Sequence, residues 1–198
     1  MIDSFSSLLH KDTERIWSCS FIQLKVNGLA IVFQYGSNTS PDRLNSEDRL
    51  CGDAKSLGLA YILGQYHLGF TVYSHKNGCA AADLIRAPGK RAWGVLYEIP
   101  DYLLSRDTSG ERKSMEDIEG PNYRRRRINV IRADEDGDLL DAWTYTVRPE
   151  KREKGLRTSL EYVNHILTGL KENQAPEEYI EEVKARILKN NPDLKDRI

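Results

Sequence analysis

The stretch Leu-Ala-Ile-Val-Phe-Gln-Tyr-Gly-Ser-Asn, residues 29–38, is an apolar, β-rich run that stops at a glycine. A second such run, Phe21–Val26, precedes it, and Asn27-Gly28 lies between the two. Asn-Gly between two strands is the strongest short-range signal for a hairpin, because both turn positions need positive φ. Residues 29–38 are therefore predicted to begin as one strand of a hairpin and to end in a loop.

The chain after this loop alternates turn signals with further β-rich segments. Ser40 or Thr39 can cap a short helix that begins near Pro41, a residue favoured in the first helical turn. The later β-rich segments are Leu57–Ser74, which divides into two strands with bends at Gly64 and Gly69, then Arg91–Ile99, Tyr123–Arg132 and Leu139–Val147. The last two segments are predicted to pair as a hairpin across an acidic turn.

The last fifty residues have helical periodicity. Ser159–Leu170 places apolar residues on one helical face, and Pro176 opens a second amphipathic helix. Short strands followed by two helices predict an α+β fold: a small mixed, mainly antiparallel β-barrel or sheet with flanking helices and a C-terminal helical pair. We expect a single domain over residues 1–198, with 1–28 an N-terminal extension that carries an extra strand and 29–198 the main folded unit.

The composition is that of a globular protein with balanced charge. The 198 residues include 29 Lys plus Arg and 30 Asp plus Glu, which gives a formal net charge of -1. This balance argues against a protein that coats nucleic acid, and the aromatic content argues against disorder. No apolar run approaches the roughly 20 residues that cross a bilayer. Charged residues also interrupt the first twenty positions, so no secretory signal is expected. Three cysteines without a Cys-x-x-Cys pair are typical of reduced thiols, and we expect a soluble, cytoplasmic protein.

Tyr35-Gly36-Ser37-Asn38 is the first candidate for a functional site. It leaves an apolar strand and turns at a glycine, so that successive N–H groups can converge on an anion. The same residue types are common in ordinary turns, and the pattern by itself favours that simpler interpretation.

An acidic cluster before Gly120 is the second candidate. Glu116, Asp117 and Glu119 are typical of a solvated helix end. They gain a catalytic role only if one carboxylate enters a pocket, where desolvation raises its pKa towards the range of a general base. The sequence does not show which side chain points inward.

The order of motifs along the chain resembles the γ-glutamylcyclotransferase family. The similar segments are Phe33–Asn38 (strand and substrate loop), Trp93–Glu98 (central strand), Met115–Gly120 (the segment ending in a catalytic Glu-Gly), Tyr123–Arg125 (start of the next strand), and Ser159–Tyr162 with Gly169 and Tyr179 (the helical pair). The likeness covers roughly residues 30–188, and the ordered set is far more specific than any one member.

The resemblance implies a cyclotransferase that releases 5-oxoproline and an amine or amino acid from a γ-glutamyl amine or peptide. In this reaction the α-amine of the glutamyl group attacks its own γ-carbonyl. An α-ammonium is not a nucleophile, so a base must first remove its proton. Glu119 stands where the family has this base, and it would then return the proton to the departing amine. No metal, nucleotide, other cofactor or covalent nucleophile is required.

The resemblance also implies a set of substrate-binding residues. These are Tyr35, Gly36, Ser37, Asn38, Tyr123 and Tyr145. The N–H groups of the loop would hold the α-carboxylate or the developing oxyanion. The expected partner is a small γ-glutamyl substrate, with no nucleic acid and no membrane, and the chain is expected to be a monomer or homodimer.

Two features leave the exact activity open. Met115-Glu116 replaces the Leu-Asp usual in the family, so a non-catalytic binding protein that keeps the fold and pocket is the alternative. The leaving amine is also open between γ-glutamyl amino acids, γ-glutamyl polyamines and a protective glutamyl group on a biosynthetic intermediate. Among the compounds of glutathione metabolism, glutathione itself is not favoured as the substrate, because the loop has Asn38 where the glutathione-specific branch of the family has leucine.

Two further clusters have simpler interpretations. Arg124–Arg127 could recognise an anion, but a strand that exposes alternate arginines to solvent is favoured. His75 and Cys79 could form a metal pair or a nucleophile set, but no further ligands stand at suitable spacing. Cys79 is therefore predicted to be a buried structural thiol.

Overall fold

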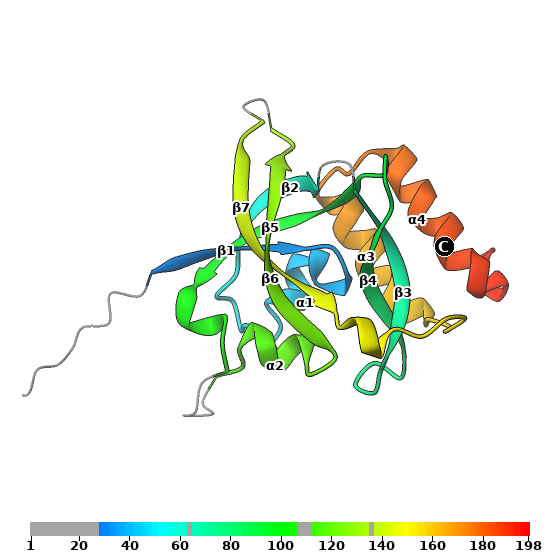
Figure 1. Cartoon of the computed structure of the whole chain (residues 1–198), viewed down its shortest axis with the longest axis horizontal. Helices are drawn as coiled ribbons and strands as arrows, with labels where there is room; N and C mark the ends of the chain where they lie inside the picture. Colours follow the sequence, from blue (N-terminus) through cyan, green and yellow to red (C-terminus); the bar gives the residue numbers. More distant parts are fainter. Residues whose placement is uncertain (1–27, 63–64, 107–111, 135–136) are drawn as a thin grey trace, which may run out of the picture.

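The structure, a computed structural model, describes residues 28–62, 65–106, 112–134 and 137–198 (Figure 1). The strands within these residues are β1 Leu29–Gln34, β2 Lys55–Ile62, β3 Tyr66–Ser74, β4 Cys79–Arg86, β5 Ala92–Pro100, β6 Tyr123–Arg132 and β7 Leu139–Val147. The helices are α1 Pro41–Leu44, α2 Met115–Glu119, α3 Leu160–Glu172 and α4 Glu177–Asn190. The predicted strand Phe21–Val26 lies outside the described residues.

Five strands close into a barrel in the order β1-β5-β2-β6-β7. Neighbouring strands are antiparallel except β1 and β7, which meet in parallel at Val32 and Trp143 and so close the barrel. The predicted hairpin is present, with β6 and β7 in register from Tyr123 opposite Val147 to Ile131 opposite Leu139. The expected α+β fold with a mainly antiparallel barrel is confirmed.

β3 and β4 form a separate two-stranded sheet beside the barrel. The sequence interpretation assigned no strand to β4, because the run Ala80–Ala82 consists of small residues with low β-propensity. In the structure these alanines are almost fully buried. Their small side chains allow a close approach: a Cβ added to Gly36 would lie 3.0 Å from the Cβ of Ala82. β4 therefore packs directly against the loop that follows β1.

The C-terminal pair α3 and α4 lies on the side of the molecule that carries β3 and β4 (Figure 1). Both helices bury the predicted apolar faces, and Ser159 caps α3 by accepting a hydrogen bond from the N–H of Tyr162 at 3.2 Å. Gly169 packs on the backbone of residues 39–40, where an added Cβ would lie 2.4 Å from the Ser40 nitrogen. Glycine at this position thus lets α3 support the loop after β1. Among the described helices, none is long and apolar enough to span a membrane.

Candidate active site

The loop after β1 folds into a buried 3₁₀ turn, Ser37–Thr39. The N–H of Thr39 donates to the carbonyl oxygen of Gly36 at 3.0 Å. Ser40 then caps α1, as predicted, because its hydroxyl accepts from the N–H of Arg43 at 3.5 Å. The turn holds the loop against α3 and the barrel end.

The short helix α2 has both of its ends fixed by local contacts. At its start, Ser114 and Asp117 form a capping box: the Ser114 hydroxyl accepts from the Asp117 N–H at 3.2 Å, and the Asp117 carboxylate accepts from the Ser114 N–H at 3.1 Å. At its end, Gly120 has φ +78° and ψ -179°, a conformation that essentially only glycine adopts. These contacts determine the point from which the side chain of Glu119 leaves the helix.

The three carboxylates of this segment have different partners. Asp117 serves the capping box and also accepts a hydrogen bond from Arg106 Nε at 2.6 Å. Glu116 is partly exposed and faces Arg125 at 3.7 Å. Glu119 is the one acidic residue among those that line the pocket beneath the loop. The structure thus answers the question that the sequence left open.

This pocket, called here the inner pocket, has a volume of about 30 Å³. It is lined by Gln34, Tyr35, Gly36, Ser37, Asn38, Ala82, Glu119, Tyr123, Tyr145 and Tyr162. All seven site residues expected from the sequence are in this set, although they come from the loop after β1, α2, β6 and β7. The fold therefore brings together residues that lie up to 110 positions apart.

The tyrosine hydroxyls of the inner pocket are bonded to backbone groups. Tyr35 donates to the carbonyl of Tyr145 and Tyr123 to the carbonyl of Ala82, both at 2.6 Å. The N–H of Ala82 donates to the Tyr162 hydroxyl at 3.0 Å. Burial raises the pKa of all four phenols, so they are neutral near pH 7. The wall around Glu119 is consequently aromatic, rigid and uncharged.

Asn38 connects Glu119 to a buried arginine. Its Nδ2 donates to Glu119 Oε1 at 3.0 Å, and its Oδ1 accepts from Arg49 Nη1 at 2.9 Å. Asn38 and Arg49 are only 5% and 6% exposed. Since a guanidinium has no acceptor, Arg49 fixes which end of the Asn38 amide faces the carboxylate. Asn38 therefore acts as a donor to Glu119 and as a spacer between the two charges.

The environment raises the pKa of Glu119 to about 7. Desolvation by burial is the dominant cause, since it disfavours the charged carboxylate. The positive charge of Arg49 and the amides of Asn38 and Gln34 act in the opposite direction and keep the pKa from rising further. A carboxyl group with this pKa exchanges a proton readily near neutral pH.

Comparison with known proteins identifies the fold that carries this pocket. Residues 91–183, which include α2, β6, β7 and α3, match the model of the AIG2-like family. A solved structure named gamma-glutamyl cyclotransferase aligns with a TM-score of 0.65 at 23% identity, over 80% of this chain and 88% of that chain. An uncharacterized protein from Homo sapiens aligns with a TM-score of 0.65 at 24% identity, over 79% of this chain and 87% of that chain. YkqA from Bacillus subtilis has a TM-score of 0.62 at 24% identity, over 81% of this chain and 54% of that chain. No curated protein sequence matches the chain.

The chain has the γ-glutamyl cyclotransferase fold. The fold implied by the resemblance is thereby confirmed, and the AIG2-like match contains the segment that carries Glu119. The motif order pointed to this segment, and the fold brings it to the same pocket as the loop 35–38.

In this cyclotransferase fold the inner pocket continues into a wider outer pocket of about 280 Å³. The two share Ser37, Asn38, Glu119, Tyr123 and Tyr162 as lining residues. The outer pocket is bordered further out by the turn between β3 and β4, at His75, Lys76 and Asn77. Glu119 is the one charged residue that lines the inner pocket, whereas the outer pocket is also lined by Arg49, Lys76 and Asp117.

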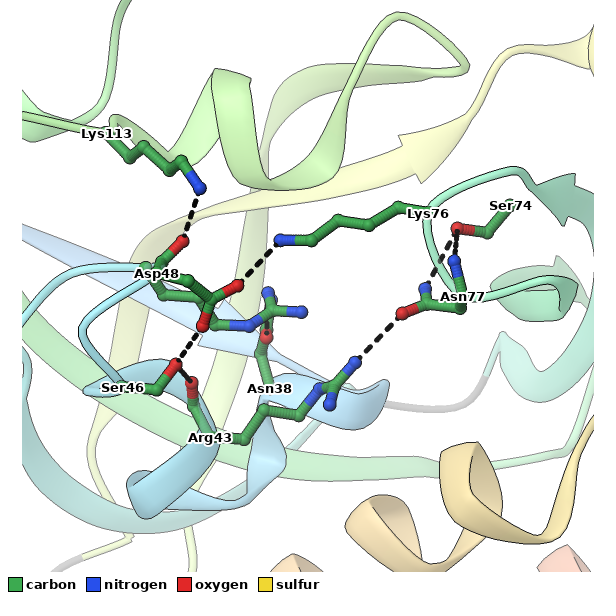
Figure 2. Close-up of polar contacts among 9 residues, drawn as sticks. Asn38, Arg43, Ser46, Asp48, Ser74, Lys76, Asn77 and Lys113 are labelled. Atoms are coloured by element: carbon green, nitrogen blue, oxygen red, sulfur yellow. Dashed lines mark hydrogen bonds and ion pairs between the residues drawn. The ribbon is translucent and has the colours of Figure 1, made fainter.

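The loop that carries Arg49 is anchored from two sides (Figure 2). Lys113, just before α2, donates to the carbonyl oxygen of Asp48 at 2.8 Å, and Lys76 pairs with the Asp48 carboxylate at 2.9 Å. Arg43 extends towards the same β3–β4 turn and donates to Asn77 at 3.0 Å. These contacts tie the Arg49 loop to the segment that leads into Glu119, which keeps the carboxylate, amide and guanidinium in line.

Sequence reasoning missed four residues of the candidate site. Gln34, Arg49, Ala82 and Tyr162 were not expected to contribute. Gln34 and Tyr162 lie within segments that carry the family resemblance, and this position in the sequence was the signal that could have found them. Arg49 and Ala82 follow no motif, and only the folded chain places them beside Asn38 and Tyr123.

The remaining clusters behave as structural elements. Cys79 is 4% exposed and its sulfur lies 3.4 Å from the Ser159 hydroxyl, which agrees with a buried structural thiol. Within the described ranges, no group of three or more His, Cys, Asp or Glu residues is placed to hold a metal ion. The arginine run forms part of β6. The Cζ atoms of Arg125 and Arg127 lie 5.0 and 4.0 Å from the centre of the Trp143 ring, so both guanidinium groups contact this ring. These stacked arginines do not form a regular alternation of exposed side chains.

Proposed function

We propose that this protein is a γ-glutamyl cyclotransferase that forms 5-oxoproline and releases an amine or amino acid, with Glu119 as general base and then general acid. The observation that carries the proposal is a single carboxylate, with a pKa near 7, in a pocket of neutral donors formed by the loop 35–38 and the tyrosines. The fold of the chain and the AIG2-like match support the same reaction class.

The chemistry begins with removal of a proton from the α-ammonium of the glutamyl group. Because its pKa is raised to about 7, the Glu119 carboxylate accepts a proton from an ammonium less unfavourably than an ordinary carboxylate does. The free amine then attacks the γ-carbonyl carbon, and the carbonyl π electrons move to its oxygen. Collapse of this intermediate breaks the bond to the leaving amine, which takes the proton from Glu119. The regenerated carboxylate then accepts the second proton of the ring nitrogen and passes it to the released amine, so that neutral lactam and an ammonium leave the site.

The shape of the site supports the cyclisation itself. The amine and carbonyl belong to one molecule, so the protein needs only to hold the glutamyl chain folded with the two atoms about 3–3.5 Å apart. The inner pocket, at about 30 Å³, has room for only one small group of the substrate, and the outer pocket, at about 280 Å³, has the volume for the remainder, including the leaving amine. The N–H groups of Gly36, Ser37 and Asn38 are proposed to bind the α-carboxylate.

A binding protein without catalysis is the second candidate. The feature that favours it is Met115-Glu116 in place of the usual Leu-Asp. Met115 is fully buried and Glu116 faces Arg125, and neither residue lines the inner pocket. The change from the usual Leu-Asp therefore leaves the wall around Glu119 intact. The site geometry favours the enzyme.

The test is release of 5-oxoproline from a panel of γ-glutamyl amino acids, γ-glutamyl polyamines and other γ-glutamyl amines. We expect turnover of at least one class by the wild-type protein and loss of turnover in Glu119→Gln, which keeps the shape but cannot accept the proton. Glu116→Gln, the same change at a residue that lines neither pocket, is the matched control and is expected to stay active. A wild-type protein that binds γ-glutamyl compounds but turns none over would support the binding protein instead, and an active Glu119→Gln would remove Glu119 from the mechanism.

A further inference from the structure

Gln34 is a buried polar residue at the end of β1 with an unused hydrogen-bond donor. Its side chain is 4% exposed, and among the described residues its Nε2 has no hydrogen-bond partner. The only other buried side-chain atom of this kind in the described part of the chain is Nε of Arg43. A buried donor without an acceptor costs stability, so its retention calls for a physical explanation.

The side chain lies in the inner pocket, next to the proposed base. Gln34 lines this pocket together with Glu119, and its amide is close enough to lower the pKa of that carboxyl group. The other large polar side chains around it are already engaged. The tyrosine hydroxyls hold backbone groups, and Asn38 is bonded to both Glu119 and Arg49. Gln34 thus offers the pocket a donor that lies beside Glu119, lowers the pKa of that carboxyl group, and has no hydrogen-bond partner of normal geometry among the described residues.

We propose that Nε2 of Gln34 donates a hydrogen bond to the γ-carbonyl oxygen of the substrate and stabilises the oxyanion that forms there. This inference rests on the proposed function. It adds a residue from β1 to the backbone N–H groups of the loop and makes the inner pocket the place where the γ-carbonyl is held.

The balance of charge decides between the oxygens of the glutamyl group. An α-carboxylate beside Gln34 would place a second anion next to Glu119, and two like charges in a desolvated site repel each other. The γ-carbonyl oxygen is neutral when the substrate binds. It becomes negative only after the amine proton has moved to Glu119, which is then neutral, so this oxygen and the Glu119 carboxylate carry one negative charge between them throughout. A neutral, preorganised amide suits this oxygen better than it suits a carboxylate.

The test compares steady-state kinetics of wild-type protein with Gln34→Met and Gln34→Leu, using whichever γ-glutamyl compound the wild type turns over best. Both variants replace the amide donor by an apolar side chain of similar size. Loss of one oxyanion donor lowers kcat by about 10²–10³-fold in other enzymes, and we expect a fall in this range with KM changed less than threefold. Gln65→Met, the same change at an exposed position, is the matched control and is expected to match the wild type.

The outcomes separate this inference from the proposed function. Because an unpartnered donor is replaced by an apolar group, the thermal midpoint is expected to stay equal or rise, so a loss of rate cannot be assigned to unfolding. Unchanged kcat, or a rise in KM alone, in folded variants of an active enzyme would overturn the oxyanion role of Gln34 and leave the cyclotransferase proposal standing. A wild-type protein without turnover would overturn both.

Discussion

Replacement of Arg49 by Met is expected to move the acid limb of the pH–rate profile upward. Arg49 is the one positive charge whose field lowers the pKa of Glu119, and it acts through Asn38. The base works only when ionised, so the wild-type rate should rise as the pH increases through about 7. Without the guanidinium, burial is less opposed, the pKa rises, and a higher pH is needed for the same ionised fraction.

The size of this effect follows from the geometry of the network. Two hydrogen bonds of 2.9 and 3.0 Å in line with one amide group place the guanidinium and the carboxylate within about 8 Å of each other. At an effective dielectric constant of about 20, two unit charges at that distance attract by about 2 kcal/mol. Since 1.4 kcal/mol corresponds to a factor of ten, the rate at pH 6 should fall roughly 30-fold.

The assay measures 5-oxoproline release from pH 5.5 to 9.5 for the wild type, Arg49→Met and Arg49→Lys. At pH 9 the Met variant should recover to within a few-fold of the wild type. The Lys variant keeps the charge, so its profile should lie near that of the wild type even if its plateau is lower. Titration of the Glu119 carboxyl carbon by NMR reads the same pKa without substrate.

A different profile would refute the electrostatic role. If Arg49→Met lowered the rate by the same factor at every pH, the arginine would act only by holding the loop, through its bond to Asn38. If the acid limb moved to lower pH, the assignment of Glu119 as the titrating base would be wrong, because removal of a cation cannot lower the pKa of a carboxyl group.

Two further predictions concern stability and helix geometry. Glu119 has a folded-state pKa near 7 against an unfolded value near 4.5, so ionisation opposes folding and the stability associated with this group is lost as the pH rises through 7. Glu119→Gln should therefore raise the free energy of unfolding by about 1–3 kcal/mol at pH 8 and change it little at pH 4.5; equal effects at both pH values in urea titrations would contradict the raised pKa. Gly120→Ala should cost about 1–3 kcal/mol through its positive φ and lower kcat by displacing Glu119. Gly137→Ala, also at positive φ but outside both pockets, should cost stability without loss of kcat, and equal activity of the two variants would show that the helix end does not position the base.

The sequence predicted the strands and helices that carry strong periodicity, and it missed the one that does not. The pairing of β6 with β7 and the apolar faces of α3 and α4 follow from alternation and helical spacing. β4 was missed because alanines report neither β-propensity nor a pattern. Its strand character comes from pairing with β3 and from packing of Ala82 against Gly36, which are long-range contacts.

The candidate site could be located from motifs but could not be oriented. The Glu-Gly segment pointed to Glu119 only through the family resemblance, since Glu116 and Asp117 are chemically equivalent neighbours. A closer physical reading of Ser114-x-x-Asp117 as a capping box would have engaged Asp117 and narrowed the choice. Arg49 could not have been found in this way, because it comes from an irregular loop whose path depends on Lys76 and Lys113.

The position of Asn38 between Arg49 and Glu119 explains how one buried carboxylate can serve as a base at neutral pH. Direct contact with the guanidinium would favour the ionised form strongly and give a carboxylate with a low pKa, which accepts protons poorly. With no cation nearby, burial would keep the group protonated at pH 7. An amide spacer gives an intermediate interaction, and it also leaves the inner pocket itself free of positive charge. A cation there would bind a substrate carboxylate in the place where the γ-carbonyl must sit. We therefore expect Asn38→Asp to lower kcat more than Asn38→Ala does. The aspartate replaces the neutral spacer with an anion that pairs with Arg49 and repels the Glu119 carboxylate.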